Sequence, residues 1–450
     1  MAVTEDKTTT SEGALTPQGA EPVSAATGPW ETVKRWVRSF EIDTRMFGMI
    51  MGLLVIWVGF HFWTGGTFLT PRNLWFLSLQ TAIVAIMATG MVLVIVSRNI
   101  DLSVGSMLGF IGMFMALLQA EWLPSMIGFD NPYTWVITLA AGLVLGAILG
   151  LIQGAVVAYV GVPSFIVTLG GLLIWRGLSW VMASGRTIAP MDTTFQLLGG
   201  GARGTVGGTI SWIIGIVAAL AIVGLLISRR RNRLKFGFRV RPLWADITLM
   251  ILGPTLILAA VWFLNQYYMP EAIAQEYAEA NGLEWPPGGL EIPFGLANPV
   301  LIALGTALVM TFVATRRRFG RYVYSIGGNP EAAQLSGIKT KRIVMLTFMV
   351  MGILVGLAAA VQIARLNSAT AGLGTLQELS VIAAAVIGGT SLSGGVGTVF
   401  GAVLGALFMQ SLQSGMVLVG IETATQDVVV GVVLVAAVAV DVAYRRRQAR

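Results

Sequence analysis

The sequence predicts an all-α, polytopic integral membrane protein of about 12 membrane segments (10 to 12), with both termini in the cytoplasm and some helices broken or re-entrant. Of its 450 residues, 55% are hydrophobic and only 11% are charged. A soluble globular chain carries about 25% charged residues. The mean hydropathy is +0.78, and the apolar residues fall in runs near the length of about 20 residues that crosses a bilayer.

The composition also excludes several kinds of chemistry. The chain has no cysteine and one histidine, His61, which removes disulfides, iron–sulfur clusters and the usual zinc sites. We therefore expect no bound metal. The net charge of +7 does not indicate a nucleic-acid partner, because the basic residues lie in short loops between apolar runs, where orientation in the membrane explains them.

Residues 1–43 are predicted to form a cytoplasmic tail that precedes a membrane domain over residues 44–450. Met1–Gly28 is polar and lacks the apolar stretch of a secretory signal, so we interpret it as disordered. Apolar residues between Trp30 and Phe40 recur at helical spacing among basic residues. That pattern is typical of an amphipathic helix on the inner membrane surface, and an extension of the first span is the alternative.

Apolar segments fill the rest of the chain. They run over Met46–Trp63, Leu74–Ser97, Val104–Gln119, Thr134–Val160, Ser164–Met182, Ile210–Ile227, Trp244–Tyr267, Val300–Thr315, Val344–Ile363, Leu376–Gly389, Thr398–Val419 and Val428–Tyr444. Val104–Gln119 and Leu376–Gly389 are too short for a full crossing and adjoin loops rich in Gly and Ser. We expect these two to be broken or re-entrant helices.

The loops between these segments alternate in charge. With the N-terminus inside, the inner loops and tails hold 24 of the 29 Lys and Arg residues, as the positive-inside rule requires of the cytoplasmic side. The predicted external loop, residues 268–298, carries five Glu and no Lys or Arg. An odd number of spans would break this alternation, so the charges support an N-in, C-in orientation.

Small residues supply the expected helix packing, since lipid gives helices no hydrophobic reason to associate. Glycines recur every four residues from Gly142 to Gly154 and again from Gly397 to Gly405. Such stripes pack helices within one chain or between two chains, and the sequence leaves both open.

The chain lacks the residues of an ATPase or an ion-coupled carrier. It contains no Gly-Lys dipeptide and hence no phosphate-binding loop of the G-x-x-x-x-G-K-[ST] type. Only Arg176 lies deep in a segment, whereas Asp246, Glu378, Asp427 and Asp441 fall near segment ends. Because proton- and sodium-coupled carriers keep such groups at mid-membrane, this distribution argues against ion coupling, and we expect no catalytic residues.

Neutral amides and hydroxyls are the main polar groups inside the spans. They are Gln80, Gln153, Gln362, Asn367, Gln410, Ser411, Gln413 and Ser414. Such groups suit a path for a neutral polyol, which needs hydrogen bonds but no counter-charge. Hydrogen bonding between helices is the alternative for any one of them.

Two polar insertions interrupt the apolar pattern. In the first, Asp101 or Ser103 is placed to cap a helix that begins near Val104. The second, residues 388–397, contains Thr390 and Ser391. Helix capping and a direct role in a path are both open for these insertions. The translocation-path candidates are therefore Asp101, Ser103, Gln362, Asn367, Thr390, Ser391 and Gln410.

A third insertion, residues 316–343, is predicted to hold a short helix on the cytoplasmic side. Asn329 reads as its N-cap, Pro330 as its first residue, Glu331 as a first-turn acid and Gly337 as its stop. Ala332 and Ala333 would let a partner approach closely. A solvated loop is the alternative.

Four segments resemble the membrane permease subunits of bacterial ABC importers for monosaccharides, the ribose, galactose and xylose group. They are IDLSVGSMLG (Ile100–Gly109), VPSFIVTLGG (Val162–Gly171), FGRYVYSIGGNPEAAQLSGI (Phe319–Ile338) and VIGGTSLSGGVGTVFGA (Val386–Ala402). The insertion Arg229–Asn298 resembles the longer xylose-type permeases more than the ribose type. The resemblance thus implies import of a neutral monosaccharide, D-xylose, across the bacterial plasma (inner) membrane.

The resemblance also implies partners. Permeases of this group pair with one another, receive sugar from a periplasmic or lipid-anchored binding protein, and dock a cytoplasmic ABC ATPase through a short coupling helix. On this chain the coupling residues would be Asn329, Pro330, Glu331, Ala332, Ala333 and Gly337. ATP and Mg would be bound by the partner ATPase, with no cofactor on this chain. The long polar N-terminus and the lengthened loop after Tyr268 depart from the family pattern.

Three other functions stay open on sequence grounds. A permease for ribose or galactose fits the same segments. A branched-chain amino acid permease of a related ABC group would want charged or helix-end partners for its zwitterionic cargo. A secondary carrier that works alone would take up its cargo without any ATPase.

Overall fold

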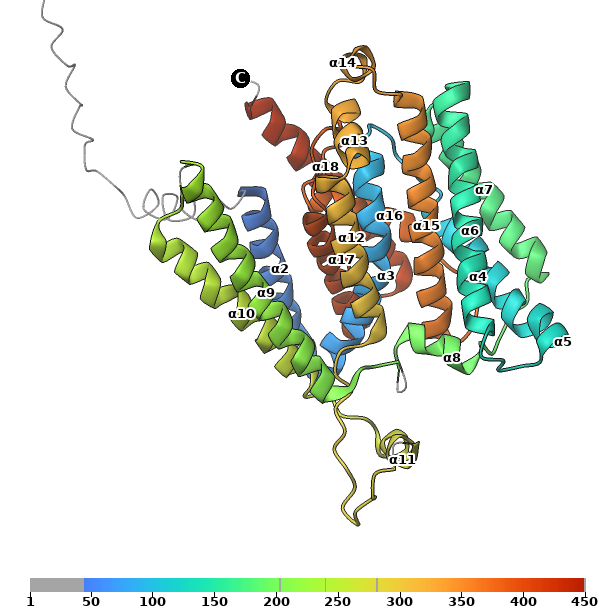
Figure 1. Ribbon diagram of the computed structural model, residues 1–450. Coiled ribbons are helices and arrows are strands. Elements are labelled where there is room, and N and C mark those ends of the chain that lie inside the picture. Colours follow the sequence, from blue (N-terminus) through green and yellow to red (C-terminus); the bar gives the residue numbers. More distant parts are fainter. Residues whose placement is uncertain (1–43, 202–203, 239, 281, 449–450) are drawn as a thin grey trace, which may run out of the picture.

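The computed structural model describes residues 44–448 apart from 202, 203, 239 and 281. The predicted tail and amphipathic helix, residues 1–43, lie outside this part of the chain. Helices fill most of it (Figure 1). They are α2 (Thr44–Trp63), α3 (Pro71–Val96), α4 (Val104–Leu117), the π-helix η1 (Leu118–Trp122), α5 (Leu123–Ile127), α6 (Thr134–Ala155), the π-helix η2 (Val156–Val160), α7 (Ser164–Ala183), α8 (Thr193–Gln196), the 3-10 helix η3 (Leu197–Gly199), α9 (Gly207–Lys235), α10 (Leu243–Leu264), α11 (Glu271–Ala280), α12 (Asn298–Arg316), α13 (Arg318–Gly328), α14 (Pro330–Leu335), α15 (Thr340–Leu366), α16 (Gln377–Ile387), α17 (Val399–Val419) and α18 (Thr423–Gln448).

Ten helices of the described chain are long and apolar enough to cross a membrane, and two shorter apolar helices lie in α16 and α18. The all-α, polytopic prediction is confirmed. The expected short helix near Leu376–Gly389 is α16, with 11 residues. The expectation for Val104–Gln119 is wrong, because the helix continues through the π-helical turn η1 and α5 to Ile127.

The bundle has a central helix that protein surrounds on nearly every side. In the most apolar stretch of α3, 89% of the residues are buried, against 6% in α10. The helices α12, α15, α16 and α17 pack around α3, whereas α10 packs mainly against α9. Both α3 and α10 are apolar on all faces, which is typical of membrane helices, so sequence periodicity does not separate the buried helix from the lipid-facing one.

The glycine stripe of α6 packs within the chain, against α15. A Cβ built on Gly146 or Gly150 would collide with the backbone carbonyl of Gly352 or Phe348. Reciprocally, a Cβ on Gly352 would collide with the carbonyl of Gly146. These residues therefore let two helix backbones touch, as small residues do in membrane bundles.

The second stripe acts in the same way between α16 and α17. Gly401 faces the carbonyl of Gly388, and Gly405 faces the carbonyl of Ala384, at distances that leave no room for a Cβ. Both stripes are used for intramolecular packing.

The two ends of the bundle differ in structure (Figure 1). At one end the loop after α10 and the helix α11 form a small separate core in which Tyr267 and Phe294 stack and Trp75 packs against both at a tilt. At the other end α14 projects beyond α3 and α15. A cavity opens near the first end.

Candidate functional site

A cavity of about 920 Å³ lies between α3, α15, α16, α17 and α18. Ligand pockets are commonly about 300–1,000 Å³. The loop residues Thr67 and Thr70, which precede α3, line its mouth, so it opens toward the end of the bundle that carries α11. The apolar side chains of Ile83, Val84 and Leu379 also line it, and α3 is fully buried beyond them.

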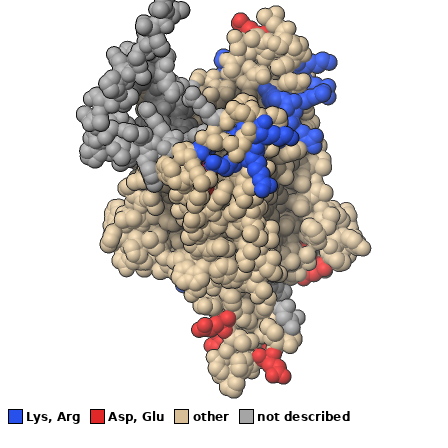
Figure 2. Space-filling model, turned by 60° about the vertical axis from the view of Figure 1, so that its left-hand side comes forward, with Lys and Arg blue, Asp and Glu red and all other residues tan. Residues whose placement is uncertain are grey.

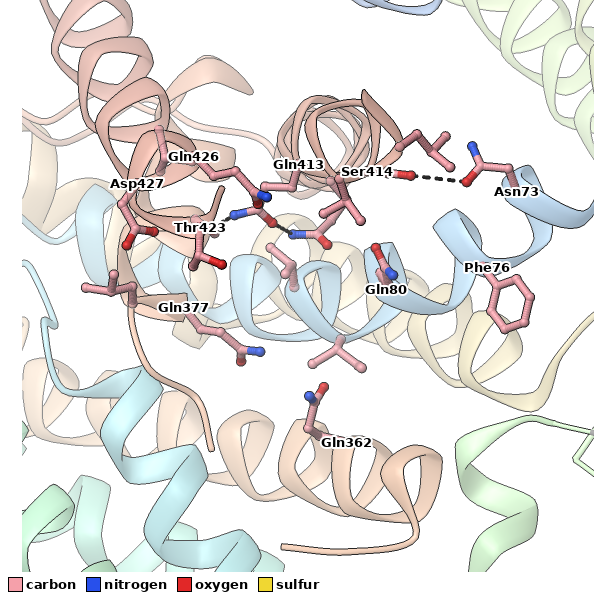
Figure 3. Close-up of a pocket in the computed structure, with 18 of the residues that line it drawn as sticks. Asn73, Phe76, Gln80, Gln362, Gln377, Gln413, Ser414, Thr423, Gln426 and Asp427 are labelled. Atoms are coloured by element: carbon pink, nitrogen blue, oxygen red, sulfur yellow. Dashed lines mark hydrogen bonds between the residues drawn. The ribbon is translucent and has the colours of Figure 1, made fainter. Parts of the chain in front are cut away.

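One face of α17 supplies the polar wall of this cavity. Gln410, Gln413 and Ser414 recur at i, i+3 and i+4, which places them on the same side of a helix. Gln410 Nε2 donates to Gln413 Oε1 at 2.7 Å, and Gln413 Nε2 donates to Ser380 Oγ of α16 at 3.1 Å. The chain of hydrogen bonds fixes the orientation of these amides at the cavity surface (Figure 3).

The facing wall comes from α3. Asn73, Phe76 and Gln80 recur along one side of this helix and line the cavity. Ser414 Oγ donates to Asn73 Oδ1 at 3.3 Å and so connects the two walls near the mouth. Figure 3 shows Gln80 pointing inward from α3, opposite Gln362 of α15.

Two amides at the cavity have unused hydrogen-bonding capacity. The Oε1 atoms of Gln362 and Gln377 are buried and accept no hydrogen bond from the described residues. Figure 3 shows both side chains directed into the cavity. A buried acceptor without a partner costs about 1–3 kcal/mol, so a ligand hydroxyl that reached either oxygen after rotation of the amide would be stabilised here.

Charged groups are confined to the rim. Arg72 is in the first turn of α3, Arg365 is near the end of α15, and Asp427 is exposed in the first turns of α18. The deeper wall, from Gln80 to Gln362 and Gln410, offers neutral donors and acceptors. This arrangement suits a neutral polar ligand better than an ion.

The cavity contains two of the seven predicted path residues, Gln362 and Gln410. Asp101 and Ser103 lie elsewhere, buried where α4 meets α6 and α7. Asp101 Oδ1 accepts from the backbone N and the Oγ of Ser103 at 2.9 and 2.6 Å, and Gln153 Nε2 donates to Ser103 Oγ at 2.9 Å. Neither side chain caps α4, so the capping prediction is wrong.

The other three predicted path residues lie in loops. Asn367 Oδ1 accepts from the backbone N of Met191 at 2.8 Å. Thr390 and Ser391 are buried in the glycine-rich loop between α16 and α17, whose Gly395 N donates to the carbonyl of Val96 at 3.0 Å. None of the three lines the cavity in this conformation.

Sequence reasoning missed several cavity residues, namely Asn73, Gln377, Ser380, Thr423 and Gln426. The sequence spacing of four of these residues could have indicated that they share helix faces. Thr423 and Gln426 are three residues apart on α18, as Gln377 and Ser380 are on α16, so each pair lies on one helix face. All five lie in the first turns of a helix, where polar residues usually read as end caps.

The opposite end of the bundle carries the predicted coupling helix as α14. Asn329 Oδ1 accepts from Ala332 N at 3.0 Å, and Pro330 is the first helical residue. Gly337 adopts φ +82°, and Ile338 N donates to the carbonyl of Ala333 at 3.1 Å. These contacts confirm the predicted cap, start and stop.

The surface of α14 differs from the expectation at one alanine. Ala333 is 4% exposed and packs into its own bundle, so it is not available to a partner. Glu331 and Ala332 are exposed. Leu335, which sequence reasoning did not single out, is 89% exposed. The accessible surface of α14 therefore consists of Glu331, Ala332, Gln334 and Leu335.

Hydrogen bonds connect α13, which leads directly into α14, to the end of α3 and to the loop before α17. Arg98, just after α3, donates from Nε to the carbonyl of Gly327 at 2.7 Å and from Nη2 to that of Gly328 at 2.8 Å. Tyr324 of α13 donates its hydroxyl to the carbonyl of Gly397 at 2.7 Å. Burial raises the pKa of Tyr324, which keeps the hydroxyl protonated as a donor.

One buried acid lies between the two ends. Glu378, in the first turn of α16, is 4% exposed, and its Oε2 has no hydrogen-bond partner among the described residues. The positive charge of Arg176 on α7 acts on it. Gly105 packs against Glu378 on the side away from the cavity, and Glu378 does not line the cavity.

Comparison with known proteins finds relatives that are all described as transport permeases. Residues 73–438 match the family described as branched-chain amino acid transport system / permease component. The chain is 38% identical to the xylose transport system permease protein of Escherichia coli K12, over 90% of this chain and 94% of that protein. The corresponding protein of Haemophilus influenzae is 36% identical over 90% and 98%. The ribose import permease protein of Escherichia coli K12 is 31% identical over 83% and 87%. No solved structure shows significant similarity.

Proposed function

Because the chain belongs to the family of branched-chain amino acid transport system permease components, we propose that it is the permease subunit of an ATP-driven importer for D-xylose. The observation that carries the sugar assignment is the cavity, which is lined by neutral amides; two of them, Gln362 and Gln377, have a buried Oε1 without a hydrogen-bond partner among the described residues. The similarity to xylose transport system permeases over 90% of the chain supports xylose over other monosaccharides.

We propose that the protein resides in the bacterial inner membrane with both termini in the cytoplasm. In the proposed topology the ten long helices, the short α16 and the apolar part of α18 alternate in direction, so that α14 would lie in the cytoplasm and α11 outside. Figure 2 supports this orientation: Lys and Arg gather near the α14 end, while the acidic side chains in view lie mostly toward the other end. Basic residues mark the cytoplasmic side of membrane proteins.

The mechanism follows from the separation of cavity and α14. In this conformation the cavity is open on the outer side, and tightly packed small residues of α15 and α16, among them Ala359 and Ala384, are fully buried. A sugar released into the cavity would exchange water for amide hydrogen bonds. Movement of α14 would reach α3 through Arg98 and α17 through Tyr324, so the inner side can open when the ATPase changes shape.

Three partners complete the proposed importer. A cytoplasmic ABC ATPase, which would hold ATP and Mg, docks on α14 and its surroundings, Asn329 to Gly337. A periplasmic or lipid-anchored sugar-binding protein delivers cargo at the α11 end, where Glu271, Glu276 and Glu279 project from α11. A second copy of the chain would complete a homodimer. This chain binds no cofactor of its own and no nucleic acid.

Replacing Gln362 by Leu should slow import without changing how the permease folds. The substitution keeps the size of the side chain but removes an amide that faces the cavity, and one lost hydrogen bond costs about 1 kcal/mol. We expect the maximal uptake rate at saturating sugar-loaded binding protein to fall about fivefold. The measurement is initial uptake of labelled xylose into proteoliposomes.

The matched control is Ser411→Ala, which also removes a polar group from inside a membrane helix, in this case α17. Ser411 Oγ accepts from Trp57 Nε1 at 2.9 Å and lies outside the cavity. Its uptake rate should stay near that of the unaltered protein. Equal rates for Gln362→Leu and the unaltered protein would remove the cavity from the proposed sugar path.

The buried Glu378 favours a second candidate function, a carrier driven by protons. Intramembrane acids commonly serve as proton relays. Under the importer proposal Glu378→Gln retains ATP-dependent uptake, and a protonophore leaves uptake unchanged. Uptake that persists without the ATPase and collapses with a protonophore would instead establish the carrier.

A further inference from the structure

The hairpin of α9 and α10 carries a small pocket that the import mechanism does not use. The pocket has a volume of about 60 Å³ and is lined by Leu226, Arg229, Arg230 and Arg233 of α9, with Arg241 and Asp246 across from them. The four α9 residues recur at i, i+3, i+4 and i+7, so they form a single helix face. Four arginines against one carboxylate give this pocket a strongly positive charge.

The pocket is held in shape by one ion pair. Arg230 Nη1 pairs with the carboxylate of Asp246 in the first turn of α10, and it donates to the carbonyl of Arg241 at 3.1 Å. The side chains of this pair are 23% and 10% exposed. Asp246 is thus paired with Arg230, and Arg229, Arg233 and Arg241 bring three further positive charges to the lining of the pocket.

The position of the pocket along α9 corresponds to the head groups of a bilayer. From Gly207 to Ile227 the helix is free of charged residues, a length of roughly 31 Å at 1.5 Å per residue. This matches the hydrocarbon thickness of about 30 Å. The arginines begin at Arg229, just beyond it. Exposed apolar side chains flank the pocket on the membrane side, including Leu225 at 59% and Leu243 at 61%.

We propose that this arginine pocket binds the phosphate head group of an anionic phospholipid from the leaflet that faces α14. Guanidinium groups form charge-assisted, often bidentate hydrogen bonds with phosphate oxygens. Basic pockets at the cytoplasmic ends of membrane helices bind such head groups. The exposed leucines would contact the acyl chains, which a soluble phosphate lacks, and the excess positive charge favours an anionic lipid over a zwitterionic one.

The chain offers a matched pair of double variants for the test. Arg229→Gln with Arg233→Gln removes two charges from the pocket and spares the Arg230–Asp246 pair. Arg231→Gln with Lys235→Gln removes two charges from the same turns of α9, but neither residue lines the pocket. Unspecific attraction between the loop and an anionic surface would weaken equally in both variants.

The measurement is native mass spectrometry of the full chain released from nanodiscs of equal phosphatidylglycerol and phosphatidylcholine. We expect the unaltered protein to retain phosphatidylglycerol in preference to phosphatidylcholine. The amount of retained phosphatidylglycerol should be at least fivefold lower in the pocket variant and within twofold of the unaltered protein in the control variant. Equal retention by the two variants, or no preference in the unaltered protein, would overturn the proposal. Displacement of the lipid by millimolar inorganic phosphate would overturn it in favour of a soluble anion. Because lipid retention is read without transport, the outcome is independent of the proposed import function.

Discussion

Replacing Leu335 by Asp should abolish ATP-driven uptake while leaving the permease folded. Leu335 is 89% exposed on α14, where nothing of its own bundle covers it. Burying a leucine against the ATPase would contribute about 1.5–3 kcal/mol, and an aspartate in the same contact would be desolvated without a partner. We expect the affinity for the ATPase to fall by at least about tenfold, measured by co-purification and by uptake.

Two further variants separate this contact from the folding of α14. Leu335→Met keeps the apolar volume and should retain uptake. Ala332→Trp adds bulk on the exposed face and should uncouple transport with the permease still folded, whereas Ala333→Trp adds it on the buried face and should displace α14 from its own bundle. Unchanged uptake in Leu335→Asp and Ala332→Trp would mean that the ATPase does not dock on this face.

Replacing Gly150 by Leu should prevent the permease from folding. A Cβ at this position already collides with the carbonyl of Phe348 on α15, and backbone cannot move aside as a flexible side chain can. Overpacking of this kind costs about 1–3 kcal/mol in a core that can adjust, and more where two backbones touch. We expect little or no monodisperse protein in detergent, measured by size-exclusion chromatography and thermal unfolding.

Gly305 of α12 provides the control for this effect. It also lies within a membrane helix, but nothing is found within 4 Å of a Cβ built on it. Gly305→Leu therefore changes helix propensity and apolar surface in the same way without a collision, and yields should stay normal. If Gly150→Leu and Gly305→Leu folded equally well, the close packing of α6 on α15 would be refuted.

The fold was largely predictable from the sequence because the bilayer imposes a simple rule on segment length. The predicted segment Ser164–Met182 corresponds to α7, and Thr398–Val419 corresponds to α17. The caps of α14 were equally accessible, since Asn329, Pro330 and Gly337 each act through local backbone chemistry. The end of α4 could not be predicted in this way. The polar residues Gln119 and Glu121 suggest a helix end, but they lie in the π-helical turn Leu118–Trp122, through which the helix continues.

The membership of the cavity could be predicted only in part. Gln362 and Gln410 were identified as polar groups inside spans, but Gln153, which has the same character, packs against Ser103 outside the cavity. Which helix faces converge depends on how α3, α15 and α17 are arranged, and the sequence does not show which of the polar side chains in these helices face one another. The sequence likewise does not show that Ala332 is exposed whereas Ala333 is buried, because this depends on how α14 packs against its own bundle.

The most direct test of the import function is uptake of labelled xylose into proteoliposomes that contain this chain, the xylose-type ATPase and the binding protein. We expect uptake of xylose that requires ATP on the side of α14, that exceeds uptake of ribose and galactose, and that disappears in Leu335→Asp. Uptake that proceeds equally without ATP, or that does not distinguish xylose from the other sugars, would contradict it.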